Sequence, residues 1–336
     1  MSKEEILLSI IILCKNEEEH IEQCLSSVLN QSKSIENTEV LVIDCASSDK
    51  SIEKAEQFSV KIIQLKASWI HTASAGRFLG VINTRGRYIF IIDADMELIG
   101  DFLEKAVTFM EKDQTIAGVA GIGKEVHIVN GEKIRCIDNL YKRNTTQICN
   151  ADYLGGAALF RRFCLEQAGS FNPYLYSQEE LELCQRLKKR WKIKTLPYLM
   201  SVHYTYPYKS IKLFKRQLGS NRFTGMGQLL RYSFGTQFFW TNFSRFKKFV
   251  FSMIFIMVII FNIPLLIIKN NSAFLAGVAI AIILPYLYLV IRKMSFKKAL
   301  LTAIIWPCII FNFAKGLFLK PKPAQDYPQD VKIIKR

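Results

Sequence analysis

Acidic residues are nearly absent from the second half of this 336-residue sequence. No Asp or Glu occurs between Glu182 and Asp326, although Lys and Arg continue throughout, and the whole chain carries a net charge of +16. An acidic first half followed by a basic second half excludes one homogeneous domain. No nucleic-acid-binding motif accompanies the basic residues, and long apolar runs interrupt them. We therefore expect membrane lipids, and no nucleic acid, as a partner of this half.

The sequence also lacks a C-x-x-C pair, although it contains eight cysteines. This absence argues against a structural zinc site or a redox pair, and cysteines within apolar runs fit buried thiols in a reducing compartment. The first apolar run, at 6–14, lacks the basic flank of a signal peptide, because Glu4 and Glu5 precede it. We interpret this run as a buried strand.

Short apolar runs alternate with amphipathic stretches through the first 110 residues. Strands are expected at 6–14, 40–43, 60–65 and 88–92, and helices at 17–29, after Asp49, at 73–83 and at 101–110. This alternation predicts an α/β layered fold with a parallel sheet. Ligands of such folds bind at the carboxyl ends of the strands.

Three charge-free apolar segments lie in the basic half, at 249–268, 273–291 and 299–314. The first two have the length of about 20 residues that a helix needs to cross a bilayer. Lys and Arg flank the outer ends of this pair, which places both flanks and the first domain in the cytoplasm. We therefore expect a multi-pass protein of the plasma membrane with a cytoplasmic catalytic domain. The alternative is a hydrophobic helical domain outside any membrane.

These features predict four parts of the chain. Residues 1–208 would form the α/β domain, 209–248 a basic and aromatic interfacial segment, 249–320 a helical transmembrane region, and 321–336 a cytoplasmic tail. Within the third part, 299–318 would be a membrane-associated segment that spans the bilayer, re-enters it or lies flat on it.

The sharpest chemical signal follows the fourth expected strand, which ends in Asp93-Ala94-Asp95. Residues i and i+2 of an extended chain point the same way, so these two carboxylates can converge on one divalent cation and, through it, on a diphosphate. Hard oxygen ligands suit Mg²⁺ or Mn²⁺. An Asp-x-Asp pair is weak by itself, because Asp is also common in turns and helix caps.

Polar residues also follow the first two expected strands. Asn16 and Glu17 come after the first, and Asp44 and Asp49 come at and after the end of the second. These groups would lie at the same edge of the sheet as Asp93, where they can bind a nucleotide base and ribose by hydrogen bonds. Helix capping is the ordinary role of a residue such as Asp49.

Several short motifs occur in one order along the chain. They are Ser9–Glu18 (SIIILCKNEE), Val42–Asp49 (VIDCASSD), Gly76-Arg77, Gly86-Arg87-Tyr88, Asp93–Asp95, Gly155–Arg161 (GGAALFR) and Glu179–Leu187 (EELELCQRL). In order and spacing the set resembles glycosyltransferase family 2 over roughly residues 6–205. The resemblance implies the GT-A fold, which has a Rossmann-like mixed sheet and flanking helices.

The resemblance also implies roles for particular residues. Glu17 and Asp44 would contact the nucleotide base, and Asp93 the ribose or the diphosphate. Asp95 would hold the divalent cation, and Arg77 would lie near the diphosphate.

Glu179 and Glu180 stand where the family usually has Glu-Asp, whose second member is the general base, so the resemblance favours Glu180 with Glu179 in reserve. The N-terminus of a helix also favours an ionised carboxylate. His203 resembles a histidine that some members place near the metal or the diphosphate, although a single His is more often structural.

Sugar transfer from a nucleotide needs a cation for the departing diphosphate and a carboxylate for the proton of the attacking hydroxyl. We therefore expect an inverting, metal-dependent glycosyltransferase that acts on a lipid-linked or cell-surface polysaccharide precursor. Transfer to a polyprenyl phosphate is the nearest alternative, because that acceptor is already ionised. The acidic, glycine-free loop 15–19 disfavours a nucleotidyltransferase, and the intact carboxylates disfavour a non-catalytic membrane scaffold.

Overall fold

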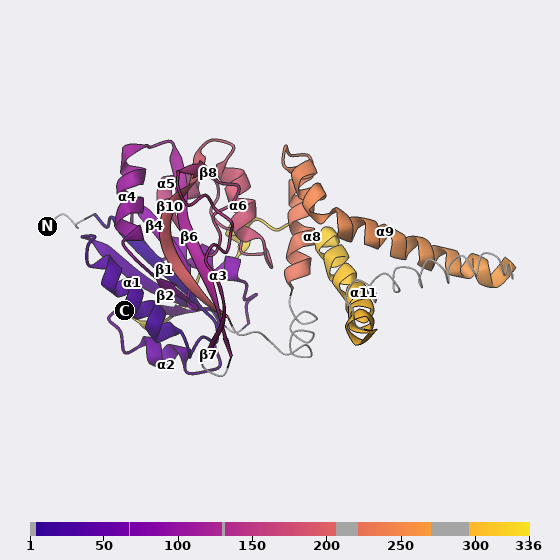
Figure 1. Cartoon of the computed structure of the whole chain (residues 1–336), viewed down its shortest axis with the longest axis horizontal. Helices are drawn as coiled ribbons and strands as arrows, with labels where there is room; N and C mark the ends of the chain where they lie inside the picture. The colour runs from indigo at the N-terminus through magenta and orange to yellow at the C-terminus, as the bar shows by residue number, and fades with distance from the viewer. Residues whose placement is uncertain (1–4, 67, 130–131, 206–220, 270–295) are drawn as a thin grey trace. The chain divides into compact units, whose positions relative to one another are not determined.

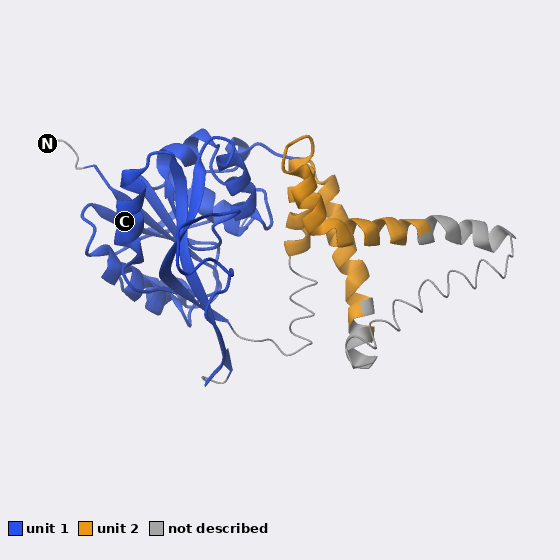
Figure 2. Cartoon of the chain, turned by 45° about the horizontal axis from the view of Figure 1, so that its top comes forward, with its two compact units in different colours: residues 1–207, 321–336 blue, residues 208–320 orange. Residues whose placement is uncertain are grey.

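The computed structural model describes residues 5–66, 68–129, 132–205, 221–269 and 296–336. The chain divides into two compact units (Figure 2). Unit 1 comprises Met1–Pro207 and Pro321–Arg336, and unit 2 comprises Tyr208–Lys320. The chain therefore leaves unit 1 once and returns to it after unit 2.

Unit 1 is built on a mixed sheet with the strand order β11-β3-β2-β1-β4-β9-β6-β10-β5, in which β7 also pairs with β6 and β8 with β10. The strands are β1 (Leu8–Cys14), β2 (Thr38–Asp44), β3 (Lys61–Gln64), β4 (Tyr88–Asp93), β5 (Met96–Leu98), β6 (Ile116–Val129), β7 (Glu132–Ile137), β8 (Cys149–Asn150), β9 (Ala158–Arg161), β10 (Lys192–Thr205) and β11 (Lys332–Lys335). Strands β3, β2, β1 and β4 are parallel, whereas β9 is antiparallel to both β4 and β6. The expected α/β fold with a mixed sheet is confirmed (Figure 1).

Helices pack on the sheet and complete its core. They are α1 (Ile21–Ser32), α2 (Ser51–Ala55), α3 (Ala73–Ile82), α4 (Phe102–Lys112), α5 (Arg162–Gln167) and α6 (Glu179–Leu187). Every residue of β1 is buried, as expected of a central parallel strand. Helix α3 can approach the sheet closely because Gly76 has no side chain: a Cβ there would lie 2.7 Å from Leu13 and 3.0 Å from Cys45.

The register of the parallel strands brings the polar residues at their ends together. Cys14 pairs with Asp44, and Asp44 pairs with Gln64. On the other side of β1, Leu13 pairs with Asp93. Because these strands run in the same direction, their carboxyl ends form one edge of the sheet.

The described helices of unit 2 are α8 (Arg222–Ser233), α9 (Phe239–Lys269) and α11 (Phe296–Phe318). Aromatic rings join α9 to α11, because Phe249 stacks on Trp306 and Phe313 at centroid distances of 5.6 and 5.3 Å. Helices α8 and α11 meet at Gly227 and Gly316, where a Cβ would overlap the backbone of the other helix. These contacts form a small core within unit 2.

The predicted transmembrane region is contradicted. Across the described residues, no helix combines the length and the apolar character that crossing a bilayer requires. The predicted multi-pass location in the plasma membrane, with a cytoplasmic catalytic domain, is contradicted with it. The second predicted span, 273–291, and the first part of the segment 209–248 lie outside the described residues.

The first and third predicted segments show why the apolar runs misled the prediction. Residues 249–268 continue a helix that already begins at Phe239; Phe249, the first of them, is 5% exposed, whereas Phe251 and Val258 are 58% and 55% exposed. Residues 299–318 belong to α11, which contains Pro307 and whose Trp306 donates a hydrogen bond to Ser252 at 3.1 Å. A count of apolar residues does not reveal which of them pack on other helices.

Candidate active site

The two aspartates of the Asp-x-Asp pair lie at the carboxyl edge of the parallel strands. Asp93 is the last residue of β4, and Asp95 is followed at once by β5. A cavity of about 200 Å³ opens beside them. Its lining comes from the ends of β1, β2 and β4 and the start of α3: Leu13, Cys14, Lys15, Glu17, Cys45, His71, Thr72, Ala73, Asp93, Ala94 and Asp95. The structure thus combines residues from four distant stretches of sequence in one cavity.

One side of the site is organised around a buried guanidinium, which we call the Arg77 cluster (Arg77, Asp93, Glu179 and Glu180). Arg77 lies on α3, and its side chain is 3% exposed. It donates to Asp93 at 3.0 Å and forms ion pairs with Glu179 and, at 3.1 Å, with Glu180. Arg77 therefore connects the Asp-x-Asp pair to the start of α6.

Burial shifts the titration of this cluster. Desolvation raises the pKa of Asp93 to about 6, although the charge of Arg77 opposes the shift. Desolvation, together with the neighbouring charge of Glu180, raises the pKa of Glu179 to about 7. The Glu179 side chain has left water almost completely and that of Asp93 is 33% exposed, and the two carboxylates share one cation.

Glu179 and Glu180 differ in their access to solvent. The Glu179 side chain is 6% exposed, whereas that of Glu180 is 21% exposed. Gln178 precedes them in the left-handed region at φ 68°, and this backbone turn starts α6 with both carboxylates in its first turn. A base must reach its acceptor, so the more accessible Glu180 is the better placed of the two.

The other side of the site is organised around an imidazole, which we call the His203 cluster (Asp95, Glu125, His127 and His203). His203 Nε2 lies 2.9 Å from Asp95 Oδ2, and His203 Nδ1 lies 3.5 Å from Glu125 Oε2. The other oxygen of Glu125 lies 2.6 Å from His127 Nε2. Burial lowers the pKa of His203, but the hydrogen bond and charge of Asp95 outweigh this effect, so the pKa is raised.

This cluster suits a divalent cation that is completed by another ligand. Asp95 Oδ1 and His203 Nδ1 are buried and have no hydrogen-bond partner among the described residues. No three His, Cys, Asp or Glu side chains of the described residues converge as a ready-made metal cage. Mg²⁺ and similar ions are commonly held by one or two carboxylates with substrate phosphates, and Asp95 with Asp93 and His203 fits that arrangement.

Glu17 lies among several negative charges at this edge of the sheet, and its pKa is raised. Desolvation raises its pKa to about 8, and the charges of Asp95, Asp93 and Asp49 add to the shift. Its backbone N–H donates to Ser51 Oγ at 2.8 Å, which fixes the loop after β1. A cation or a proton would relieve the repulsion between these carboxylates.

Asp44 is fully buried at the end of β2 and does not line the cavity, although its neighbour Cys45 does. Its Oδ2 accepts hydrogen bonds from the Ser47 N–H at 3.0 Å and from Gln64 Nε2 at 2.9 Å. Its Oδ1 is buried without a partner. A buried carboxylate oxygen without a donor is costly, but Asp44 has no exposed surface, so its predicted contact with a nucleotide base stays a prediction.

Asn16 and Asp49 shape the loops instead of lining the cavity. Asn16 Oδ1 accepts a hydrogen bond from the Ser48 N–H at 2.8 Å. Both oxygens of Asp49 are occupied, by the Glu18 N–H at 3.1 Å and by Ser51. The structure therefore gives these two residues a loop-forming position and leaves their predicted contact with nucleotide as a prediction.

The sequence interpretation missed several residues of the site. Glu125 and His127 lie on β6 within an irregular stretch of sequence, and only the pairing of β6 with β10 brings them to His203. Their alternate spacing on one strand was the available signal. The motif glycine Gly156 permits a close approach, because a Cβ there would lie 2.6 Å from Asp93 Oδ2.

The comparison with known families agrees with this geometry. Residues 9–169 match the family described as "Glycosyl transferase family 2". An uncharacterized glycosyltransferase of Haemophilus influenzae is 30% identical over 141 residues, which are 40% of this chain and 42% of that protein. The beta-monoglucosyldiacylglycerol synthase of Trichormus variabilis is 25% identical over 203 residues, which are 57% of this chain and 43% of that protein. The chain thus spans less than half the length of these two relatives.

Among solved structures, the chain is similar to a mannosyltransferase from Pyrobaculum calidifontis in complex with GDP-Man and Mn²⁺. The TM-score is 0.57 at 14% identity, and the match covers 93% of this chain and 87% of that one. At this identity the likeness shows the fold. It supports the expected GT-A-like architecture, and the family match over residues 9–169 agrees with the expectation of a transferase enzyme.

Proposed function

We propose that this chain, whose residues 9–169 match glycosyltransferase family 2, is an inverting and metal-dependent glycosyltransferase. It would transfer a sugar from a nucleotide-sugar donor to a lipid-linked or cell-surface polysaccharide precursor, with catalysis in the predicted domain 1–208. The observation that carries the proposal is Asp95 Oδ1, a buried carboxylate oxygen that has no hydrogen-bond partner among the described residues and belongs to a residue lining the cavity. This oxygen is suited to hold a cation.

The donor would bind along the cavity with its base toward Asp44 and its diphosphate toward Asp95. A bound Mn²⁺ or Mg²⁺, held by Asp95 with Asp93 and His203, would supply charge stabilisation for the departing diphosphate. Arg77 would hold Asp93 in place and add positive charge beside the phosphates. Glu17 would border the donor from the loop after β1.

Glu180 would act as the general base and remove the proton of the acceptor hydroxyl as it attacks the sugar. Its position in the first turn of α6 and its exposed fraction of 21% support this role, with Glu179 as the alternative. A single base opposite the leaving group leads to direct displacement, and therefore to inversion at the anomeric carbon.

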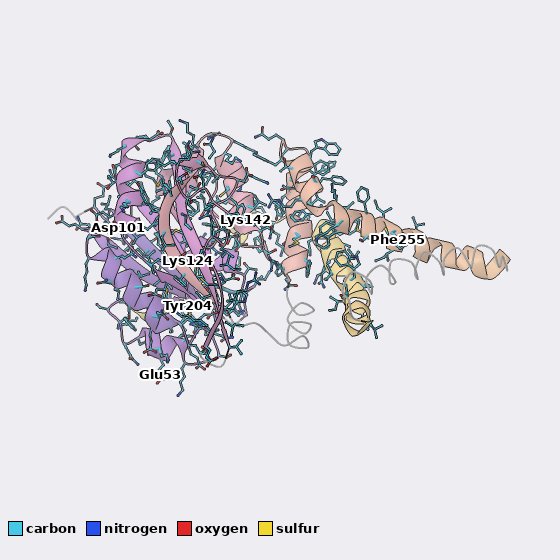
Figure 3. The ribbon with its side chains drawn as sticks, viewed as in Figure 1. Glu53, Asp101, Lys124, Lys142, Tyr204 and Phe255 are labelled. Atoms are coloured by element: carbon cyan, nitrogen blue, oxygen red, sulfur yellow. The ribbon has the colours of Figure 1, made fainter. Side chains whose placement is uncertain are left out.

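A lipid-bearing acceptor is supported by two observations. One relative is named a beta-monoglucosyldiacylglycerol synthase, and diacylglycerol is a lipid. Unit 2 also exposes large apolar side chains, among them Phe251 at 58%, Phe255 at 45% and Phe311 at 71% (Figure 3 labels Phe255). Apolar surface of this kind suits contact with membrane lipids or a lipid chain.

The first experiment is a panel of nucleotide sugars tested for binding and hydrolysis, with and without Mn²⁺. We expect at least one donor to bind in a Mn²⁺-dependent way. A chain that binds no member of the panel in calorimetry would contradict the proposal and favour a non-catalytic scaffold.

The second experiment distinguishes a hydroxyl acceptor from a polyprenyl phosphate. Glu180→Gln should lower kcat by about 10²–10⁴, the usual contribution of a general base, while donor binding is retained. Glu179→Gln is the matched variant, and a larger loss there would transfer the role to Glu179. Normal turnover of Glu180→Gln would favour a phosphate acceptor, which needs no base.

A further inference from the structure

The last residues of the sequence return from unit 2 to the sheet of unit 1 (Figure 2). Strand β11 pairs antiparallel with β3, with Lys332 opposite Gln64 and Ile333 opposite Ile63. Beyond them, Lys335 Nζ donates to the carbonyl oxygens of Glu56 and Phe58 at 2.5 and 2.7 Å. The segment 321–336 therefore belongs to the fold of unit 1, and its strand β11 covers the edge of β3.

Tyr327 anchors this segment at the side of the cavity. The residue is 2% exposed. Its ring contacts three aromatic rings edge-on, with centroids 5.9 Å from Trp69, 6.2 Å from Phe78 and 5.6 Å from Tyr174. Its hydroxyl donates to the carbonyl oxygen of Ile70 at 2.7 Å, across 257 positions of sequence.

The residues that Tyr327 holds lead directly into the cavity. Ile70 is followed by His71, Thr72 and Ala73, which line it. Ile70 itself is 37% exposed, so its own side chain is not fully packed in the core. The hydrogen bond from Tyr327 therefore fixes the backbone one residue before the lining begins.

Tyr327 also contacts the segment that leads to the Arg77 cluster. Tyr174 lies five residues before Glu179, and the same segment is tied to α3 by two hydrogen bonds. Thr72 Oγ1 donates to the Pro173 carbonyl at 2.9 Å, and Ser74 Oγ donates to the Asn172 carbonyl at 2.6 Å. Tyr327 thus contacts two segments near the site. It meets the one before α3 through Trp69 and Ile70, and the one before α6 through Tyr174.

We propose that Tyr327 is a positioning residue for the donor cavity, so that segment 321–336 forms part of the site for a nucleoside diphosphate. The inference rests on the proposed function for the nature of the ligand. The expected effect of Tyr327 on the backbone of residues 68–72 does not depend on that function. The Tyr327 hydroxyl holds the Ile70 carbonyl, and the position of His71 and Thr72 along the cavity follows from it.

The test uses the full chain with Tyr327→Phe, which keeps the ring and removes the hydroxyl. UDP and GDP serve as probes in calorimetry with Mn²⁺. We expect the Kd of the nucleotide that wild type binds to rise about 2- to 10-fold, the effect of one lost hydrogen bond. The donor KM should rise with it, while kcat at saturating donor stays near the wild-type value. Hydrogen exchange of peptides covering 68–72 should become faster.

Lys335→Met is the matched control, because it loosens the same segment at its other end. We expect it to leave nucleotide Kd and exchange at 68–72 at the wild-type values. Equal Kd for Tyr327→Phe and wild type, or equal changes in both variants, would overturn the inference and leave Tyr327 a purely structural residue. A wild type that binds neither nucleotide would instead refute the donor assignment. In that case, unchanged exchange at 68–72 in Tyr327→Phe would also refute the positioning role, and faster exchange would retain it.

Discussion

The two charged clusters of the site differ in how completely their charges are paired. In the Arg77 cluster, one permanent and buried cation contacts three carboxylates, of which Glu179 is buried and Asp93 and Glu180 are partly exposed. In the His203 cluster, the central cation exists only when the imidazole is protonated, and Asp95 Oδ1 and His203 Nδ1 have no hydrogen-bond partner. The first cluster is satisfied by the protein itself, whereas the second needs a further ligand.

This difference separates two kinds of residue that look alike in the sequence. Asp93 and Asp95 are two positions apart, yet Asp93 belongs to the closed cluster and Asp95 to the open one. We infer that the Arg77 cluster mainly holds the site together and that the His203 cluster mainly captures the cation. The following predictions test that separation, beginning with the largest expected effect.

Arg77→Met should cost stability as well as activity. The substitution leaves three carboxylates without their buried cation, and breaking such a pair typically costs about 3–5 kcal/mol. Urea unfolding measures the loss. Arg87→Met is the control, because the Arg87–Glu111 pair is 49% and 37% exposed and should contribute little. Similar stability of both variants would contradict a closed, structural Arg77 cluster.

Asp95→Asn should weaken Mn²⁺ binding without comparable loss of stability. We expect the Kd for Mn²⁺, measured by electron paramagnetic resonance in the presence of nucleotide, to rise by more than about 100-fold. Residues that contact a metal ligand without binding the metal typically contribute about 10- to 100-fold. Asp101→Asn removes an exposed carboxylate on the other side of β5 and should leave Mn²⁺ affinity unchanged. If Asp95→Asn keeps wild-type affinity, the cation assignment fails.

Glu125→Gln should have an intermediate effect on the same measurement. Glu125 faces His203 Nδ1 and would orient the ring toward the cation, and partners of this kind typically contribute about 10- to 100-fold in affinity. Saturating Mn²⁺ should restore most of the activity. Asp138→Asn, which alters an exposed pair with Lys124, is the matched control. An affinity equal to wild type would show that Glu125 does not position His203.

The pH dependence of stability should reveal the crowded carboxylates. The folded pKa values of Glu17, Glu179 and Asp93 are raised to about 8, 7 and 6. The folded state therefore binds more protons than the unfolded state between about pH 4 and 8, so stability should fall as pH rises through this window.

Glu17→Gln should reduce this pH dependence, because the variant cannot ionise. In metal-free buffer we expect its Tm at pH 8 to exceed that of wild type by roughly 2–4 °C, what about 1 kcal/mol produces in a domain of this size. At pH 4.5 the two proteins should melt together. A lower Tm at pH 8 would show that the ionised Glu17 is stabilising.

Local sequence patterns were sufficient for the central sheet. The apolar run of β1 and the alternation that follows it predicted β2, β3 and β4 and the helices α3 and α4, because hydrophobic periodicity reports which side of an element is buried. They were not sufficient for 249–268, where the predicted membrane span is contradicted. The composition of an apolar segment alone does not decide whether its helix crosses a bilayer.

The motifs of the site could be predicted from the sequence, but the contacts between their side chains could not. The sequence indicated that Asp93 and Asp95 meet the polar ends of neighbouring strands at one edge, and the family resemblance added Glu180. It did not indicate that Arg77 would contact both Asp93 and the two glutamates, because such a contact depends on the packing of α3 against the sheet. Nor did any pattern connect Tyr327 to Ile70.

By itself, the sequence determined that a buried strand ends in two aspartates and that the polar ends of the neighbouring strands meet there. Both follow from properties of a few consecutive residues. Only the tertiary structure decided which aspartate is paired with Arg77, which oxygen is left open, and that residues 321–336 return to the edge of the sheet. These outcomes depend on contacts between residues far apart in the chain, whose geometry no local pattern specifies.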